Sequence, residues 1–254
     1  MTVRLIKAFF NFLVRRDLIQ ENPLQDIVGL PENAIIPFIF SPEETDLLLE
    51  AVCRWMRKTR RSYLGDYSAY IAVLLMARCG LRLSETRNLL KNNFRPEEKT
   101  IYIEKTKFKK DRLIPIPKSV VYEINNLLKV RHSLLSMDAT PRLLIKNDLT
   151  GLSRSYIDHR FNKAIKHINL NQPRKVIGTT NFLGPSRHSL RHSFAVNTLK
   201  RIKCQGKSPQ SALPVLAVYL GHKEYKYTTK YLKVLDAKHR QLLHDFSITM
   251  QEKI

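Results

Sequence analysis

His188 and Arg191 are the residues of this sequence whose types and spacing point most directly to chemistry. Pro185 and Ser186 come just before them and predict a helix start, with the Ser186 side chain as its N-cap. Residues three apart share one face of a helix, and the first turns of a helix attract anions through free backbone N–H groups and the helix dipole. The pattern therefore predicts a phosphate site. Because H-x-x-R is a short motif, its weight depends on the rest of the chain.

Arg82 is a second candidate phosphate ligand. An almost wholly apolar helix is predicted over residues 67–78 and ends at Gly80, and Ser84 is expected to cap a further helix that runs to about Lys91. A short connection between two helices would hold the Arg82 guanidinium rigidly, which suits bidentate binding of a phosphate. For an isolated arginine, a surface position in a turn is the alternative interpretation.

Lys107 lies in a lysine-rich turn, residues 105–111, between two segments that alternate in the manner of strands, 100–106 and 112–117. A charged hairpin tip is usually only solvated. A lysine on such a tip can also reach a DNA groove or the leaving oxygen of a phosphodiester, and at this point both interpretations stay open.

Two further reactive side chains follow near the C-terminus. The apolar segment 212–220 is predicted to be a helix, and His222 follows it directly after a glycine. Tyr231 comes nine positions later, in a short predicted helix. His222 could merely cap the preceding helix, and Tyr225 and Tyr227 are neighbours that compete with Tyr231 for the role of nucleophile.

The charge of the chain indicates a polyanionic partner. Lys and Arg number 44 against 22 Asp and Glu, a net charge of +22 in 254 residues. Self-repulsion of that size opposes compact folding. Nucleic acid fits better than a membrane, because the charge is spread along the chain and no apolar run reaches the length of a membrane span. Three cysteines without C-x-x-C pairing, and no secretory pattern, lead us to expect a cytoplasmic protein without a zinc site.

The middle of the chain has the periodicity of helices that pack in a core. Residues 41–44, Ser-Pro-Glu-Glu, form a strong helix start with an N-cap, a proline and a capping glutamate. The apolar residues that follow at helical spacing are expected to be buried: Leu47, Leu48, Ala51, Val52 and Trp55. Helices are also predicted over residues 118–131 and 153–168, and a polar loop over 169–184. With the hairpin, these elements predict a mainly α fold with a small antiparallel β-sheet, of the α+β class.

Both ends of the chain are predicted to be amphipathic helices. Over residues 3–18 an apolar stripe is expected to face inward, formed by Leu5, Ala8, Phe9, Phe12 and Leu13. A single helix cannot bury its own apolar face, so this segment should either end a small domain or dock on the remainder, before a linker that reaches Pro37. Residues 236–250 have a second stripe, formed by Leu242, Leu243, Phe246 and Ile248.

Taken together, these residues resemble the active site of the tyrosine recombinase (phage integrase) family, which implies six catalytic positions: Arg82, Lys107, His188, Arg191, His222 and Tyr231. The motifs stand in the family's order, as GLRLSE (80–85), KFKKDRLIP (107–115), HSLRHSFA (188–195), LGH (220–222) and TTKY (228–231). Any one motif is unremarkable, whereas all five in order are highly specific. The resemblance covers roughly residues 40–235 and implies the tyrosine recombinase catalytic-domain fold.

The resemblance also implies how the chain is organised. Residues 1–30 correspond to a remnant or the last helix of an N-terminal core-binding domain plus linker, and residues 31–254 to the catalytic domain with a C-terminal helix at 236–250. In this family that helix often docks on a neighbouring subunit, so we expect self-assembly on DNA as a tetrameric synapse with helix exchange. Packing of the helix on its own domain is the alternative. The long join between residues 194 and 220 is closest in style to mobile-element integrases.

The chemistry requires neither a metal nor another cofactor. Arg82 and Arg191 can neutralise the non-bridging oxygens of a phosphodiester in the transition state. Attack by Tyr231 would form a covalent phosphotyrosine, which keeps the bond energy, so that rejoining needs no ATP. No acidic cluster of the kind that holds catalytic Mg²⁺ is evident in the sequence.

Proton transfer falls to three further residues. Lys107 is the candidate acid for the leaving 5′ oxygen, and His188 would accept the tyrosine proton or bind the phosphate. His222 would donate a hydrogen bond to a non-bridging oxygen. We expect Glu85 to have a structural role at its helix start and His192 to support or pack against the site.

The sequence therefore predicts a bacterial, DNA-associated, site-specific recombinase or integrase of a mobile element, acting through a 3′-phosphotyrosine intermediate. One alternative is a truncated DNA-binding or regulatory relative, since most of the N-terminal domain is missing. The other is a type IB topoisomerase-like enzyme, whose chemistry is similar but whose motif spacing and size fit less well. The full set of six residues favours the recombinase, because a protein that only binds DNA has no need of Tyr231.

Overall fold

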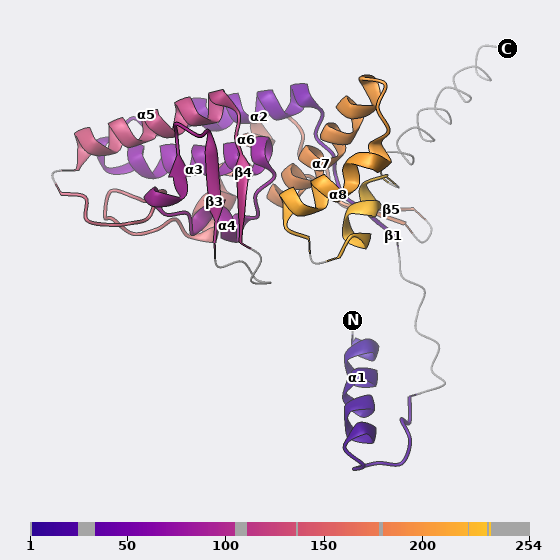
Figure 1. The fold of residues 1–254 in the computed structure, drawn as a ribbon. Coiled ribbons are helices and arrows are strands. Elements are labelled where there is room, and N and C mark those ends of the chain that lie inside the picture. The colour runs from indigo at the N-terminus through magenta and orange to yellow at the C-terminus, as the bar shows by residue number, and fades with distance from the viewer. Residues whose placement is uncertain are drawn as a thin grey trace.

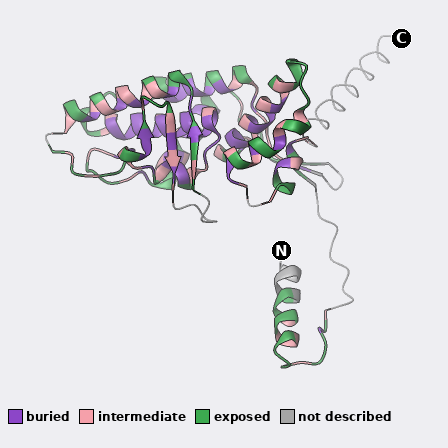
Figure 2. Ribbon diagram, in the orientation of Figure 1, coloured by how far each residue is buried: buried purple, intermediate pink, exposed green. Residues whose placement is uncertain are grey.

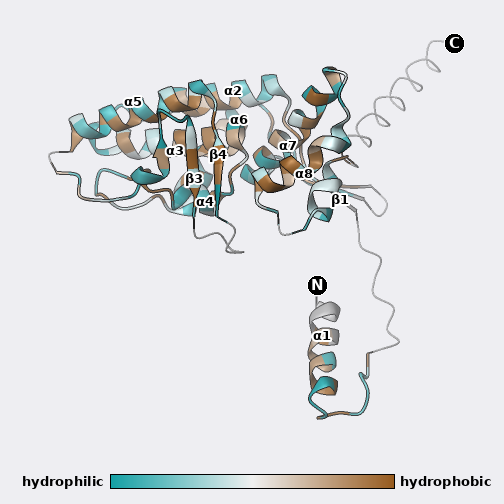
Figure 3. Cartoon of the chain, in the orientation of Figure 1, coloured by the Kyte–Doolittle hydropathy of each residue, from teal (hydrophilic) through white to brown (hydrophobic). Residues whose placement is uncertain are grey.

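Helix α3, Arg60–Cys79, is the element against which most of the others pack. The computed structural model describes residues 2–24, 34–104, 111–135, 137–177, 180–222, 224–232 and 234. Nearly every residue of α3 from Leu64 to Cys79 is buried, and Figure 3 shows brown, hydrophobic stretches along this helix. Its partners surround it in Figure 1, namely α2 (Pro42–Arg54), α4 (Leu83–Arg87), α5 (Lys118–Leu134), α6 (Arg154–His167) and α7 (Arg187–Cys204).

The start of α2 is the one expected from the sequence. Ser41 accepts a hydrogen bond from the Glu44 N–H, the Glu44 carboxylate accepts one from the Ser41 N–H, and Pro42 opens the helix. The expected stripe is wrong at both ends, because Leu47 is 53% exposed and Trp55 is 40% exposed. Leu47 lies on the solvent side of α2. Trp55 follows the last turn, where the Lys163 ammonium sits 4.0 Å from its ring centroid.

Gly80 ends α3, as predicted, in the left-handed conformation with φ of 62°. A side chain there would be strained and would also meet the Phe194 ring. The next helix, α4, differs from the prediction, because its N-cap is Arg82 instead of Ser84 and it ends at Arg87. The cause is Glu85, whose carboxylate accepts the hydrogen bond of the Arg82 N–H. The short helix η1, Lys91–Asn93, follows it.

The predicted hairpin forms the edge of a three-stranded antiparallel sheet made of β2 (Phe94–Arg95), β3 (Thr100–Ile103) and β4 (Arg112–Pro115). Ile101 faces Ile114 across the two longer strands, and both are buried. This confirms the mainly α fold with a small antiparallel sheet. Lys107, in the turn between β3 and β4, lies outside the described residues.

A second three-stranded sheet was not predicted. It consists of β1 (Ala34–Ile36), β6 (Thr180–Phe182) and β5 (Lys175–Ile177), in that order, and β1 pairs with β6 in parallel. Two segments interpreted as linker and polar loop therefore contain strands. Each strand has only three residues, too few for a periodic pattern, and the pairing joins segments that are far apart in the sequence.

A smaller hydrophobic cluster lies between α7, α8 (Pro209–Leu220) and the helical residues 226–232. Its buried members are Ala195, Val196, Leu199, Leu213, Leu216, Leu220 and Tyr231. Ser186 caps α7 and Gly221 ends α8 with φ of 63°, as predicted. The segment before α2 is held by Ser193 of α7, whose hydroxyl oxygen accepts a hydrogen bond from the Phe40 N–H.

Helix α1, Thr2–Arg15, is amphipathic as predicted, but the described residues do not bury its apolar face. Phe9 is 56% exposed and Phe12 is 51% exposed, so the expected inward orientation is wrong (Figure 2). The predicted helix at 236–250 lies outside the described residues. In the part of the chain that the structure describes, no helix has the length and apolarity needed to span a membrane.

Candidate active site

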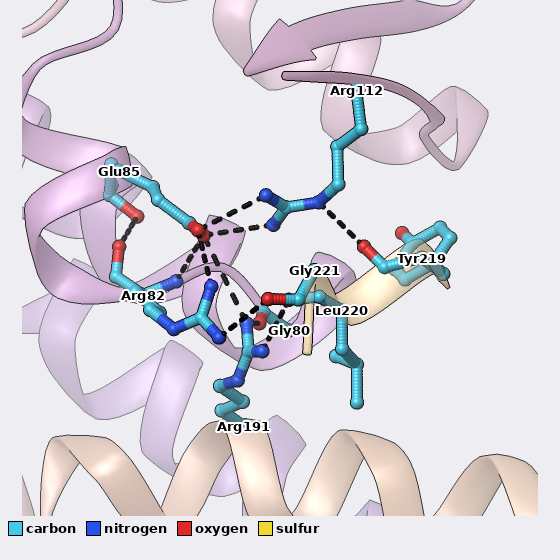
Figure 4. A network of polar contacts seen from close by, with 9 residues as sticks. Gly80, Arg82, Glu85, Arg112, Arg191, Tyr219, Leu220 and Gly221 are labelled. Carbon is cyan, nitrogen blue, oxygen red and sulfur yellow. Dashed lines mark hydrogen bonds and ion pairs between the residues drawn. The ribbon is translucent and has the colours of Figure 1, made fainter. Parts of the chain in front are cut away.

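Three arginines from three different elements gather around the carboxylate of Glu85 (Figure 4). Arg82 Nη1 donates to Glu85 Oε1 over 2.7 Å, and Arg112 binds both carboxylate oxygens, over 3.1 Å and 3.0 Å. Arg191 Nη1 lies 3.9 Å from Glu85 Oε2. One buried anion thus holds together three guanidiniums that would otherwise repel one another.

The same arginines also bind the three consecutive carbonyls at the end of α8. Arg112 Nε donates to the Tyr219 carbonyl over 2.7 Å, Arg191 Nη2 donates to the Leu220 carbonyl, and Arg82 Nη2 donates to the Gly221 carbonyl over 3.0 Å. The last carbonyls of a helix have no partner within the helix and carry partial negative charge. The arginines therefore fix the position of the turn that leads from α8 into His222 (Figure 4).

Burial and charge set the protonation of this cluster. Burial alone would raise the pKa of Glu85, but the hydrogen bonds and charge of Arg112, with help from Arg82, lower it below the usual value. Burial and the neighbouring charge of Arg82 lower the pKa of Arg191 to about 10, so its guanidinium stays charged at neutral pH. Three guanidiniums against one carboxylate leave a net charge of +2, which favours an incoming anion.

A row of aromatic rings lies beside the arginines. The ring centroids of His188 and His192 are 4.5 Å apart, those of His192 and Tyr231 are 5.6 Å apart, and those of His222 and Tyr231 are 6.0 Å apart. Tyr231 is only 4% exposed. Burial raises the pKa of its hydroxyl, while the charges of Arg191 and Arg82 act in the opposite direction. The hydroxyl is therefore protonated and shielded from water.

The three histidines are neutral at physiological pH. Burial, with the proximity of His188 and Arg191, lowers the pKa of His192 to about 3. Burial, with the charges of Arg191 and Arg82, lowers the pKa of His222 to about 4. Loss of hydration and the charge of Arg191 lower the pKa of His188, the most exposed of the three. Neutral imidazoles can accept a proton. His222 Nδ1 lies 2.7 Å from the Thr228 hydroxyl, which can donate to it and leave the ring proton on Nε2.

The structure brings five of the six predicted residues together: Arg82, His188, Arg191, His222 and Tyr231. Lys107, the sixth, lies outside the described residues. The capping alternative for His222 also holds in part, because its backbone N–H donates to the Ala217 carbonyl while its ring stacks on Tyr231. The competing tyrosines, Tyr225 and Tyr227, are 48% and 43% exposed.

Two residues of the site had no role in the sequence analysis. Arg112 stood in one of the motifs, but no spacing rule links it to Glu85 or to the end of α8. Thr228 also stood in a motif, and its contact with His222 follows from the tight turn between them. Glu85 has the expected structural role at its helix start, where it accepts the hydrogen bond of the Arg82 N–H, and it is also the anion at the centre of the arginines.

Comparison with known proteins finds a matching family model, similar sequences and structures of similar fold. A model of the phage integrase family matches residues 40–238. The protein y4rB of Sinorhizobium fredii, named as an integrase/recombinase, is 28% identical over 228 residues, which cover 89% of this chain and 71% of y4rB. Tyrosine recombinase XerC of Alcanivorax borkumensis is 26% identical over 241 residues, which cover 94% of this chain and 69% of XerC.

Among solved structures, a post-cleavage complex of the XerH site-specific recombinase with palindromic difH substrate has a TM-score of 0.67 at 20% identity. The match covers 90% of this chain and 59% of the XerH chain. At that identity the likeness establishes the fold alone.

Proposed function

The chain belongs to the phage integrase family and has the catalytic domain of a tyrosine-type DNA strand-transferase, and from this premise we propose that it cuts and rejoins double-stranded DNA at specific sites through a 3′-phosphotyrosine intermediate. The observation that carries the proposal is the position of Tyr231, a buried tyrosine whose ring contacts His192 and His222 beside the guanidinium of Arg191. A protein that only bound DNA would not need a tyrosine in this place.

In the proposed reaction Arg82 and Arg191 bind the non-bridging oxygens of the scissile phosphate, where negative charge develops. The Tyr231 hydroxyl oxygen attacks phosphorus and its proton passes to His188. The bond from phosphorus to the 5′ oxygen breaks, and Lys107 supplies the proton that this oxygen takes up. Rejoining reverses these steps with the 5′ hydroxyl of another strand, so no external energy source is required.

His222 has a narrower role in this scheme. With Thr228 bound to Nδ1, its Nε2–H can donate to a non-bridging oxygen while the ring stays neutral. The residue thus adds a hydrogen bond and no charge, and the arginines supply the electrostatic stabilisation.

Double-stranded DNA is the proposed partner, and the net charge of +22 supports it. Binding that neutralises phosphates releases counterions, so the affinity should fall steeply as salt is raised. Titration of duplex DNA at two ionic strengths tests this, with Tyr231→Phe as a control that should bind equally well. An affinity that does not change with salt, or that is lost in Tyr231→Phe, would contradict it.

For the biological setting, we propose a mobile element. The length of the segment from residue 194 to residue 220 supports this proposal. One matching structure of similar fold, with a TM-score of 0.59 and 19% identity over 91% of this chain, is a Tn1549 transposon integrase in complex with circular intermediate DNA.

We further propose that residues 1–30 are the end of a core-binding domain, that 31–254 form the catalytic domain, and that the helix at 236–250 is exchanged in a tetrameric synapse. The exposed apolar face of α1, with Phe9 and Phe12, fits a segment that belongs to a larger unit. Deleting residues 236–254 should leave monomer folding and duplex binding intact but abolish higher-order complexes in light scattering with DNA. A large loss of thermal stability in the isolated monomer would show instead that the helix packs on its own domain.

Covalent capture tests the proposed reaction itself. A pool of duplexes is first selected by binding, the bound duplexes are nicked near candidate cleavage positions so that the released strand diffuses away, and a protein–DNA adduct is sought after denaturation. The adduct should form with the native chain and with Tyr227→Phe, the exposed neighbour, and should vanish in Tyr231→Phe. Binding without any adduct would favour the DNA-binding relative. Relaxation of supercoiled DNA without a preferred site would favour the topoisomerase-like enzyme.

A further inference from the structure

Arg112 connects both halves of the active site, and we propose that it is a positioning residue that fixes His222 relative to Arg82 and Arg191 without binding DNA itself. The proposal rests on the function proposed above, because it assigns Arg112 a part in that reaction. The resemblance to the recombinase family did not assign this arginine a role.

The Arg112 side chain joins three elements. It begins β4, where it pairs with Ile103 in the last strand pair before the turn of the hairpin. From there its guanidinium binds both oxygens of Glu85 on α4, and its Nε donates to the Tyr219 carbonyl on α8. A planar guanidinium can make these three bonds at once because its donors form a rigid fork.

Burial separates Arg112 from Arg82, one of the two arginines expected to bind phosphate, but not from Arg191, whose side chain is 3% exposed. The Arg112 side chain is only 8% exposed, whereas that of Arg82 is 28% exposed. The two edges of its guanidinium already bind a carboxylate and a carbonyl. Arg112 therefore acts through Glu85 and the end of α8, which it binds. Of Arg112 and Arg82, Arg82 is the one whose guanidinium an incoming phosphate can reach.

The contact of Arg112 with Gly221 shows how this arginine fixes the position of His222. A Cβ built on Gly221 would lie 2.8 Å from Arg112 Nη1 and 3.0 Å from its Cζ, so the glycine backbone packs directly on the guanidinium. Gly221 adopts a left-handed conformation and immediately precedes His222. When the arginine is shortened, the turn loses both its hydrogen bond at Tyr219 and the surface on which it packs.

Lysine in place of Arg112 separates positioning from charge. Arg112→Lys keeps the positive charge, but a single ammonium lacks the fork that binds two carboxylate oxygens and a carbonyl in fixed geometry. In the native structure the N–H groups of residues 221 and 222 donate to the carbonyls of Val218 and Ala217. We expect the hydrogen exchange of these two amides to be faster in Arg112→Lys. We also expect covalent adduct formation to slow by about 100-fold, the cost of a misplacement of roughly 1 Å.

Arg131 provides the matched control. It is equally buried, at 1% exposure, and binds both oxygens of Asp138 and several carbonyls, in a network that shares no residue with the active site. Arg131→Lys should lower thermal stability without changing exchange at 221 and 222 and without slowing adduct formation at temperatures where it is folded. If Arg112→Lys fails to fold, Arg112→Gln, which retains an N–H donor, replaces it.

Hydrogen exchange does not depend on catalysis, so the two proposals can fail separately. Faster exchange at 221 and 222 in a chain whose native form makes no adduct would uphold the positioning role and refute the proposed reaction. The positioning role would be overturned if hydrogen exchange at 221 and 222 were unchanged in the Arg112 variant, or if it rose no more than in Arg131→Lys. Either result would count whatever the rate of adduct formation.

Discussion

Replacing Glu85 by glutamine removes the one negative charge among three guanidiniums. The Glu85 side chain is 5% exposed and accepts hydrogen bonds from Arg82 and Arg112. When its negative charge is removed, water cannot solvate the guanidiniums in place of the carboxylate. Glutamine keeps the shape and one oxygen acceptor. Its amide nitrogen, however, directs N–H groups toward the guanidiniums, which are themselves donors only.

The magnitude follows from burial. Removal of one partner from a buried ion pair costs about 3–5 kcal/mol, because the remaining charge is left uncompensated. For a domain of this size, each kcal/mol lowers the melting temperature by about 2–4 °C, which gives a total decrease of roughly 6–20 °C. The carboxylate also has a depressed pKa, so this stability is present above the normal pKa of a glutamate and is lost as the pH falls through the lower value in the folded state.

Thermal unfolding with and without inorganic phosphate is the assay. The net charge of the cluster rises from +2 to +3 in Glu85→Gln, so phosphate should raise the melting temperature of the variant more than that of the native chain. Glu50→Gln is the control, since Glu50 pairs with Arg54 on the surface, where both side chains are more than 60% exposed, and such pairs contribute about 0–1 kcal/mol. Equal melting temperatures for the two variants would refute the central role of Glu85.

Three further predictions concern the proton-transferring residues. Lys107→Ala should cleave ordinary DNA poorly but recover much of its rate on a substrate whose 5′ bridging oxygen is replaced by sulfur, a leaving group that needs no proton; rescue in Lys110→Ala instead would show that the acid is a different lysine. Thr228→Val should lower the free energy of unfolding by about 1 kcal/mol, the contribution of one hydrogen bond. Adduct formation should slow by more than that energy explains, because the His222 tautomer is no longer fixed. A loss of rate that corresponds to the same ~1 kcal/mol would contradict this prediction. His192 and His222 have folded pKa values of about 3 and about 4, below the unfolded value of 6.5, so unfolding takes up protons and stability should fall as the pH is lowered from 6.5 toward 4. Urea unfolding across that range should show a shallower pH dependence in His192→Phe, and an identical slope would refute the assignment.

The features that sequence reasoning predicted well are those specified within a few residues. Ser41 and Glu44 cap α2 by contacts three positions apart, and Gly80 and Gly221 end their helices because they adopt positive φ without a steric penalty. The order of the motifs was enough to identify five residues that the structure brings together. The residue types in those motifs indicate the same chemistry as the geometry does.

The features that it missed depend on contacts between distant segments. Arg112 and Glu85 are 27 positions apart, and only the packing of β4 beside α4 makes them partners. Ser84 had the better side chain for an N-cap, yet the position of Glu85 makes Arg82 the first residue of the turn. Trp55 fitted the apolar stripe of its helix, but the helix ends just before it, and its ring instead contacts Lys163.

The parallel pairing of β1 with β6 has a consequence for how the chain folds as it is made. Ala34 pairs with Thr180, 146 positions later, and Phe40 binds Ser193 and Asn197 of α7. At synthesis rates of about 5–20 residues per second, the segment 34–40 must wait roughly 7–30 s for its partners to leave the ribosome. Contacts of such high sequence separation form late, because the entropy of closing the loop precedes the gain from pairing. The packing of α2, α4, α5 and α6 around α3 can therefore form first, whereas the second sheet and the contacts of α7 with α3 and Phe40 form only when residues 175–204 have been synthesised.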